Sequence, residues 1–344
     1  MSFPRSADQL DDDFLGRALG FGVALRSVEP VGVGRGFVGE LARVTYEASG
    51  RTATLIAKFS SSRPETRAAA HRAGNYRREV EFYRSLAAVV GVRVPRCSGA
   101  WLDENTGEFV LLLEDVPSDP DVDQLVGLDP ARAEAVIRSI ARLHARTWRD
   151  DRWVGVDWLP RLATRRANLT ALAAAGAPQL MGWLAADGRF RPGDASAIEQ
   201  LPDRIGDVLT RLEELPMCVV HSDLRLDNIL FPPTGEPVVL DWQGVGLGPP
   251  SWDLAYFLTQ SLTVEARRAY EEPLLAAHHA AVRSEGVDVP ITTLHAGYVD
   301  ALWFGLVVAC AVVAIASPGD ARSERIAIAM ASRAIAALGD HSAF

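Results

Sequence analysis

A short stretch in the second half of the chain gathers acidic, basic and amide side chains within eight residues. The letters HSDLRLDN are followed by an apolar segment and then by DWQG. Asp223 could orient an attacking hydroxyl and accept its proton, and Arg225 could meet the negative charge on the transferred group. Asn228 and Asp241 offer the oxygen ligands that Mg²⁺ takes in proteins. The spacing therefore predicts magnesium-dependent phosphoryl transfer.

A single lysine, Lys58, stands among 34 arginines. An arginine serves wherever a generic positive charge is enough, whereas a lysine offers a compact ammonium on a slender stem. Lys58 closes the apolar run LIAKF, which has the character of a strand. The presence of this single lysine has two explanations: it is there by chance, or it belongs to a site that needs an ammonium group. Composition alone leaves both open.

Three glycines, Gly34, Gly36 and Gly39, have the G-x-G-x-x-G spacing of a loop that approaches phosphates closely. The same spacing occurs in dinucleotide-binding turns, where the glycines follow a strand and begin a helix. Here they begin LARVTYEA, which is rich in the residue types that favour strands. We therefore interpret the glycines as part of a hairpin that covers nucleotide phosphates.

The elements that must position these residues change in character along the chain. In the first third, a hairpin is predicted around Ser49-Gly50, a helix over 68–90, and a second strand pair around the turn at 104–107. After Pro117 the pattern is helical, interrupted once by the strand-and-turn segment that carries the phosphoryl-transfer residues. Helices are predicted over 129–148 and near 161–175, 195–215, 263–284, 292–316 and 321–338. The order of elements predicts an α+β fold.

The motif H-x-D-x-x-x-x-N followed by a metal-binding aspartate resembles the catalytic loop of the protein-kinase-like superfamily. More narrowly, HSDLRLDNIL, VVLDWQG and WDLAYFL resemble the aminoglycoside-phosphotransferase and choline-kinase-like families, and GRGFVGELARV points to their ecdysteroid-kinase-like branch. The resemblance runs from about residue 31 to residue 258. It implies a bilobal protein-kinase-like fold. A small antiparallel-sheet lobe over 1–113 would bind the nucleotide, 114–116 would form a hinge, and a mainly helical lobe over 117–344 would hold the catalytic loop and the acceptor.

The resemblance also implies roles for residues of the first lobe, with ATP and Mg²⁺ as cofactors. Lys58 stands where the family has the lysine that binds the nucleotide phosphates, and its partner would be Glu79 or Glu81. These glutamates are two positions apart and face different directions on a helix. Glu79 is preferred because the family glutamate precedes an apolar-x-Phe-Tyr run. Adenine would bind the backbone near Glu114 and Val116.

In the second lobe the resemblance assigns supporting residues. Asp253 matches the aspartate that braces the catalytic loop, and capping of its own helix is a compatible alternative. His221 is interpreted as a structural hydrogen-bonding residue, because Asp223 already fills the role of the base. Other histidines lack the spacing of metal ligands, and His144 is expected in a helix core: His144, His278, His279 and His295.

The acceptor is predicted to be a small molecule with a hydroxyl group. Only eleven residues separate Asp241 from Asp253 and no A-P-E motif is present, which leaves little room for a protein substrate. Acidic and aromatic residues that could line its site are interleaved with arginines, which favours a neutral, partly apolar alcohol over a highly cationic aminoglycoside. The candidates for this lining are Asp150, Asp151, Trp153, Asp157, Trp158, Trp183, Tyr298 and Trp303.

Three other functions stay open at this point. The protein could be a nucleotide-binding pseudokinase that senses or scaffolds, an antibiotic phosphotransferase of the aminoglycoside type, or a transferase that moves a nucleotidyl group. The joint presence of Lys58, Asp223, Asn228 and Asp241 disfavours the pseudokinase.

Composition excludes several classes of partner. The net charge of −9 argues against nucleic acid, because proteins that bind phosphate backbones present basic surfaces. The uncharged run at 301–316 is shorter than the ~20 residues that span a bilayer, so we interpret it as a buried core helix and expect no membrane partner. Three scattered cysteines in apolar surroundings predict free, buried thiols in a cytoplasmic protein: Cys97, Cys218 and Cys310.

Overall fold

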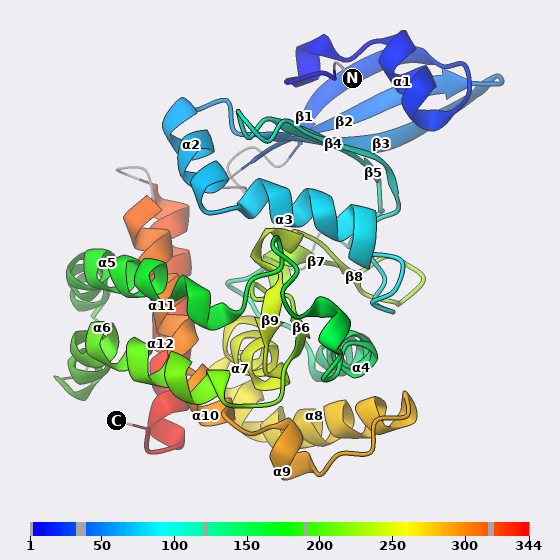
Figure 1. Cartoon of the computed structure of the whole chain (residues 1–344). Coiled ribbons are helices and arrows are strands. Elements are labelled where there is room, and N and C mark those ends of the chain that lie inside the picture. Colours follow the sequence, from blue (N-terminus) through cyan, green and yellow to red (C-terminus); the bar gives the residue numbers. More distant parts are fainter. Residues whose placement is uncertain (1–2, 32–38, 120–122, 189–191, 316–319, 344) are drawn as a thin grey trace. The chain divides into compact units, whose positions relative to one another are not determined.

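The computed structural model of the protein (Figure 1) describes residues 3–31, 39–119, 123–188, 192–315 and 320–343. Within it the chain divides into two units. The first unit consists of Met1–Val89, Arg93–Ser118 and Leu230–Gly244, and the second of Val90–Val92, Asp119–Ile229 and Val245–Phe344. The segment around Asp241 therefore packs with the sheet-bearing unit, whereas the sequence analysis places it in the helical lobe. The expected hinge at 114–116 also lies inside the first unit.

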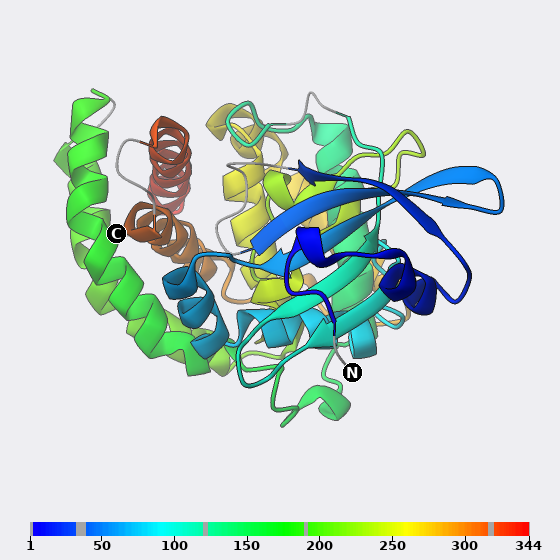
Figure 2. The same ribbon diagram turned by 90° about the horizontal axis from the view of Figure 1, so that it is seen from above.

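The first unit is built on a five-stranded antiparallel sheet with the order β1-β2-β3-β5-β4. Its strands are β1 (Ala24–Val31), β2 (Gly39–Ala48), β3 (Arg51–Ser60), β4 (Cys97–Leu102) and β5 (Phe109–Glu114). Figure 2 shows the twist of this sheet. The predicted hairpin is confirmed: β2 and β3 are joined by Ser49 and Gly50, whose φ angles of 50° and 73° suit a two-residue turn. The second predicted pair is β4 with β5.

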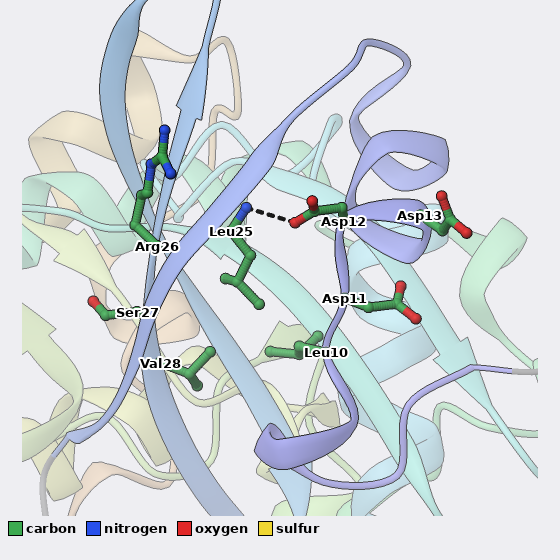
Figure 3. A pocket seen from close by; sticks show the side chains of 8 residues that line it. All are labelled: Leu10, Asp11, Asp12, Asp13, Leu25, Arg26, Ser27 and Val28. Carbon is green, nitrogen blue, oxygen red and sulfur yellow. Dashed lines mark hydrogen bonds between the residues drawn. The ribbon is translucent and has the colours of Figure 1, made fainter.

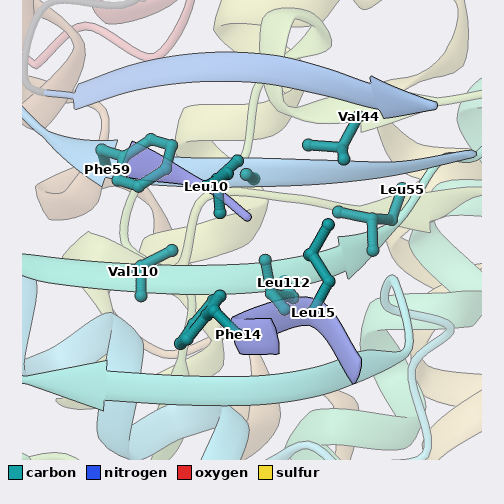
Figure 4. Close-up of a cluster of buried hydrophobic side chains, with 9 residues drawn as sticks. Leu10, Phe14, Leu15, Val44, Leu55, Phe59, Val110 and Leu112 are labelled. Atoms are coloured by element: carbon teal, nitrogen blue, oxygen red, sulfur yellow. The ribbon is translucent and has the colours of Figure 1, made fainter. Parts of the chain in front are cut away.

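Helices cover both faces of this sheet. The short turn η1 (Ala7–Gln9) and α1 (Asp12–Leu19) lie on one face, and α3 (Asn75–Glu81) lies on the other (Figure 1). The cluster beneath α1 is drawn in Figure 4. Its buried members are Leu10, Phe14, Leu15, Val44, Leu55, Ala57, Phe59, Val110 and Leu112.

Because side chains alternate along a strand, the central strands contribute to both layers. Val110 and Leu112 of β5 join the cluster beneath α1, whereas Phe109, Leu111 and Leu113 pack on the side of α3. On β3 the same alternation sends Leu55, Ala57 and Phe59 toward α1. Lys58 therefore points to the α3 face.

The single helix predicted over 68–90 is wrong in detail. The structure has α2 (Pro64–Arg72) and α3, separated by Gly74 at φ 73°, a conformation that glycine adopts without strain. α3 then continues as a π-helical turn, η2 (Phe82–Leu86). In this turn Phe82 stacks on Trp242 with ring centroids 3.9 Å apart, which ties the DWQG segment to the helix.

The second unit surrounds α7 (Pro250–Ser261), all of whose residues are buried. Most of the predicted helices are confirmed in outline. The helix predicted near 161–175 lies later, at Arg166–Ala186, and the single helix predicted near 292–316 is wrong, because the structure divides that stretch into three helices. The long helices follow one another along the chain. They are α4 (Pro130–Arg146), α5 (Arg166–Ala186), α6 (Pro192–Glu213), α8 (Val264–Ser284), α11 (Trp303–Ile315) and α12 (Ala321–Asp340). Shorter elements complete the helical set: η3 (Asp151–Trp153), η4 (Leu162–Arg165), α9 (Ile291–Leu294) and α10 (Tyr298–Ala301).

Short strands carry the motif residues of the chain. In the second unit, β6 (Cys218–Val220) pairs antiparallel with β9 (Gly246–Gly248), and the 3₁₀ turn η5 (Leu226–Asn228) follows the loop after β6. The strand β7 (Ile229–Leu230), at whose end the chain re-enters the first unit, pairs with β8 (Val238–Val239). The turn η6 (Trp242–Gly244) then completes the DWQG segment.

Two helical stretches, Arg166–Ala186 and Ile291–Ala314, are long and apolar enough to cross a membrane by length and composition alone. In the second of them, 67% of the apolar window is buried inside the structure, as a core helix requires. The thiols of Cys97, Cys218 and Cys310 are all free; the last two are buried and Cys97 is half-buried. Burial raises the pKa of Cys97 to about 11 and that of Cys310 to about 12, so these thiols stay protonated near neutral pH.

Candidate active site

The lone lysine of the chain lies between two carboxylates of the first unit. Lys58 Nζ is 2.6 Å from Glu79 Oε1 and 3.2 Å from Asp241 Oδ1. β3 supplies the lysine, α3 the glutamate and the DWQG segment the aspartate, so three separate parts of the sequence meet here. Glu81, the rejected partner, pairs with Arg84 instead. The ion pair therefore agrees with the choice of Glu79.

The pKa values of Lys58 and Glu79 depend on the burial of each group and on the charges of its neighbours. Burial lowers the pKa of Lys58, but the charges of Asp241 and Glu79 and their hydrogen bonds outweigh it, so the pKa is raised overall. Burial raises the pKa of Glu79, and Lys58 opposes that rise. A raised lysine pKa stabilises the fold below the pKa of the unfolded lysine, and this stabilisation is lost as pH rises through the folded value.

Gln243, which the sequence analysis does not single out, fixes the far side of Glu79. Its Nε2 donates to Glu79 Oε2 at 3.1 Å, while its backbone oxygen accepts from Arg78 Nε at 2.7 Å. Arg78 also donates to Ala73 O at 2.7 Å and is 8% exposed. These bonds hold both oxygens of Glu79 and fasten the DWQG segment to α3. In the sequence, the position of Gln243 two residues after Asp241 could have indicated that it belongs to the site.

Replacing Gln243 with glutamate should destabilise the protein in a pH-dependent way. The new carboxylate would face Glu79 Oε2, and leaving that buried acceptor without its donor costs about 1–3 kcal/mol. Repulsion between the two carboxylates raises their pKa values, so the loss should be largest at pH 8 and should shrink toward pH 5 as one of them gains a proton. The thermal unfolding midpoints of wild type, Gln243→Glu and Gln243→Leu at pH 5, 6.5 and 8 measure this. A Gln243→Glu deficit that is equal at all three values would contradict it.

Residues near the predicted glycine loop and hinge are partly described. Gly34 and Gly36 lie outside the described residues. At Gly39 an added Cβ would lie 2.8 Å from Phe59 O and 3.5 Å from the Cε atom of Lys58, so a side chain there would crowd the lysine strand. At the hinge, Glu114 is held by Arg93 (2.6 Å), and Val116 is buried.

In the second unit, Asp223 is oriented by three neighbours. Tyr256 Oη donates to its Oδ1 at 3.0 Å, and Asn228 Nδ2 donates to its Oδ2 at 2.9 Å. Arg225 Nε lies 3.3 Å from Oδ1, and Arg225 Nη1 donates to Asp227 Oδ2 at 2.7 Å. The Asp223 side chain keeps 34% of its surface exposed, so the carboxylate is fixed in direction and still accessible.

Tyr256 is a second site residue that sequence reasoning missed. It follows Asp253 by three positions on α7, and this spacing on a helix could have indicated a shared face. Burial and then the charge of Asp223 raise the pKa of Tyr256 well above its ordinary value. The phenol therefore stays protonated and donates to the carboxylate.

Asp253 braces the loop before Asp223 and does not cap its helix. Its Oδ2 accepts from His221 N at 2.7 Å and its Oδ1 accepts from Ser222 N at 2.8 Å, whereas the N-cap of α7 is Pro249. These two bonds fix Ser222 at φ 69°, an uncommon left-handed conformation for a residue with a side chain. His221 is buried, and its Nδ1 accepts from Asp223 N at 3.2 Å, which is a structural contact.

Several residues expected to line an acceptor site are occupied elsewhere. Tyr298 is buried and its hydroxyl donates to Glu271 Oε2 at 3.0 Å. Trp303 is 2% exposed, and Arg204 lies over its ring at 5.2 Å. Asp150 accepts hydrogen bonds from the backbone N–H and the guanidinium of Arg152 and caps η3. These side chains have partners within the second unit, and their place in an acceptor site stays a prediction.

In the first unit, a hollow of about 650 Å³ lies between α1 and β1 (Figure 3). Its acidic side chains serve the local backbone: Asp11 Oδ1 accepts from Phe14 N at 2.7 Å and Asp12 Oδ1 from Leu25 N at 2.6 Å. Arg26 on its wall pairs with Glu47. We therefore assign the hollow a structural origin.

Solved structures of small-molecule kinases share this fold. A spectinomycin phosphotransferase in complex with ADP and spectinomycin matches 97% of this chain and 99% of its own, with TM-score 0.57 and 13% identity. A choline kinase from Streptococcus pneumoniae matches 92% and 94%, with TM-score 0.54 and 16% identity. At these identities the likeness establishes the fold alone, and it confirms the predicted protein-kinase-like fold.

By sequence, the chain matches a curated relative and the sequence pattern of a family. Over 80 residues the chain is 32% identical to an uncharacterized kinase-like protein of Caenorhabditis elegans, a match that covers 23% of this chain and about a fifth (21%) of that protein. None of these comparisons bears on the ecdysteroid-kinase-like branch, which stays a prediction. The sequence pattern of the APH family, described as the phosphotransferase enzyme family, matches residues 34–286. The chain therefore belongs to the phosphotransferase enzyme family.

Proposed function

We propose that the enzyme transfers the γ-phosphate of ATP to a hydroxyl group of a small molecule and uses Mg²⁺ as its cofactor. The observation that carries this proposal is the placement of Lys58. The only lysine of the chain is buried, charged and held between Glu79 and Asp241. An ammonium fixed in this way is suited to nucleotide phosphates, and the adenine would bind the backbone near Glu114 and Val116.

The chemistry of the donor atoms fits Mg²⁺. Asp241 presents a carboxylate with 37% of its side-chain surface exposed, and Asn228 uses its amide nitrogen on Asp223, which leaves the amide oxygen as its donor to a metal. Among the described residues no group of three or more His, Cys, Asp or Glu could hold a metal by itself. Mg²⁺ commonly takes one or two protein oxygens and completes its shell with phosphates and water. Such an ion would neutralise charge on the phosphates.

The transfer itself rests on Asp223. Its carboxylate accepts the proton of the acceptor hydroxyl, while the acceptor oxygen forms a bond to the γ-phosphorus and the bond from that phosphorus to the bridging oxygen of ADP breaks. Tyr256 and Asn228 hold the carboxylate in one direction during this step. Arg225, 3.3 Å from the same carboxylate, supplies a cation for the charge that develops on the phosphoryl group.

We propose a neutral or weakly charged alcohol as the acceptor. The related structures include enzymes named for spectinomycin and choline, so the fold accommodates quite different hydroxylated molecules. Between residues 150 and 166 the acidic side chains are interleaved with arginines, which disfavours a highly cationic acceptor. The three free thiols suit a reducing compartment, and we propose a cytoplasmic enzyme.

Incubation with Mg²⁺-ATP and pooled alcohols tests the proposal. The pools should include choline-like, sterol-like, sugar and aminoglycoside members, and mass spectrometry should find a product heavier by one phosphate group together with ADP. Products that carry AMP would contradict phosphoryl transfer and support the nucleotidyl alternative. ATP binding without any product from any pool would favour a nucleotide sensor.

A further inference from the structure

Behind the catalytic loop, three histidines of the second unit, two of them buried and one half-buried, form a continuous hydrogen-bonded chain that ends on Asp253. His144 Nε2 lies 3.2 Å from Asp253 Oδ2, and His144 Nδ1 lies 2.9 Å from His278 Nε2. His278 Nδ1 in turn lies 3.2 Å from His295 Nε2. The histidines come from α4, α8 and the C-terminal end of α9, so the chain joins three elements to α7.

When the rings are neutral, the hydrogen bonds among these three histidines and Asp253 have only one possible donor–acceptor direction. An ionised carboxylate only accepts hydrogen bonds, so His144 must carry its proton on Nε2 and accept at Nδ1. His278 must then donate from Nε2 and accept at Nδ1, and His295 must donate from Nε2. The charge of Asp253 thereby selects the same tautomer in all three rings.

Burial keeps His278 and His295 neutral. His144 and His278 are fully buried. Burial, with a smaller effect of the neighbouring histidines, lowers the pKa of His278 well below its ordinary value and that of His295 to about 4. His279, the neighbour of His278, does not take part in these histidine contacts, because its Nε2 contacts Val289 O at 2.7 Å.

The row of histidines is important for the position of Asp253, because this carboxylate has few partners. No Lys or Arg pairs with this buried carboxylate among the residues that the structure describes. Its bonds come from His144 and from the backbone N–H groups of His221 and Ser222. The last of these residues has positive φ and directly precedes Asp223. A change in the donor from His144 would therefore be transmitted to the loop that aims the base.

We propose that His144, His278 and His295 form a positioning relay that holds Asp253, and through it the 221–223 loop, in the geometry required for phosphoryl transfer. The proposal rests on the proposed function for its link to turnover, but the relay itself has a readout that needs no activity. His278 and His295 act through Asp253 and touch no reacting atom, so they are positioning residues.

A matched pair of substitutions at His278 tests the relay. His278→Gln places an amide N–H near the position of Nε2 and should preserve the donor to His144, whereas His278→Leu removes it at similar volume. We expect about a 10-fold lower kcat for His278→Leu, the lower end of the losses found when outer-shell hydrogen bonds behind metal ligands are removed. His278→Gln should stay within about 3-fold of wild type, and KM for ATP should change little in either. Equal kcat losses in both variants, or none in His278→Leu, would overturn the proposal.

Two further measurements separate the relay from the kinase proposal and from simple instability. The ¹⁵N spectrum of the wild-type imidazoles should show Nε2–H tautomers for His144, His278 and His295, and a ring with Nδ1–H at His144 would overturn the relay. Backbone hydrogen exchange over 219–224 should be faster in His278→Leu and unchanged in His278→Gln. These results hold even if no acceptor is phosphorylated. If His278→Leu does not fold, His295→Leu, at the half-buried end of the chain, should show the faster exchange, and its absence there would also overturn the relay.

Discussion

Replacing Asp223 with asparagine should abolish most turnover while leaving nucleotide binding intact. Asparagine has nearly the same shape and can still accept from Tyr256 Oη, which now lies 3.0 Å from Asp223 Oδ1. It cannot accept a proton from the acceptor hydroxyl. General base catalysis contributes about 10²–10⁴-fold, so kcat should fall by that factor with KM for ATP nearly unchanged. Steady-state kinetics with the acceptor found in the pooled assay, together with calorimetric ATP binding, measure the two effects.

Two other substitutions in the same neighbourhood calibrate this result. Asp227→Asn makes the identical chemical change four residues away, and its amide oxygen can still accept from Arg225, so we expect kcat within about 3-fold of wild type. Tyr256→Phe keeps the carboxylate but removes one bond that orients it, and a loss near 10-fold corresponds to about 1.4 kcal/mol. An Asp223→Asn enzyme no slower than Tyr256→Phe would show that Asp223 orients the substrate without accepting its proton.

Local sequence patterns were sufficient for the strand pairs of the sheet and for the motifs of this chain. The β2–β3 hairpin follows from two strand-like runs around Ser49-Gly50, where a two-residue turn with positive φ leaves few alternatives. Lys58 could be placed because the chain has one lysine and because alternation along β3 gives it a face of the sheet. The resemblance around residues 221–228 and 241–244 identified the family, and the match over 34–286 confirms it.

Contacts between distant segments could not be read from the sequence. The break at Gly74 depends on how α2 and α3 pack, and a helix pattern across it looks continuous. Gln243 reaches Glu79, 164 positions away, and Tyr256 reaches Asp223, 33 positions away. His144 was expected as a core residue; its burial is confirmed, but its bonds to Asp253 and His278 arise from three helices that only tertiary packing brings together.

Replacing Lys58 with methionine should remove activity and also weaken the first unit. Methionine fills a similar volume but leaves Glu79 buried without its cation, and breaking a buried ion pair from one side costs about 3–5 kcal/mol. Without Lys58 the pKa of Glu79 rises further, because burial already raises it and the lysine was the main opposing charge. A carboxyl whose pKa is raised by folding stabilises the fold below its unfolded pKa and loses that contribution as pH rises through the folded value. The Lys58→Met protein should therefore be least deficient near pH 5 and most deficient near pH 8, measured by urea unfolding.

A double variant separates this stability effect from the catalytic one. Lys58→Met with Glu79→Gln removes the uncompensated charge, and the amide can still accept from Gln243 Nε2, which lies 3.1 Å from Glu79 Oε2 in the wild type. Its unfolding free energy should return to within about 1 kcal/mol of wild type and lose the pH dependence. Its kcat/KM for ATP should stay at least about 100-fold below wild type, because no ammonium remains to meet the phosphates. Recovery of activity along with stability would mean that Lys58 serves only to neutralise Glu79, and the nucleotide-phosphate role would have to pass to an arginine.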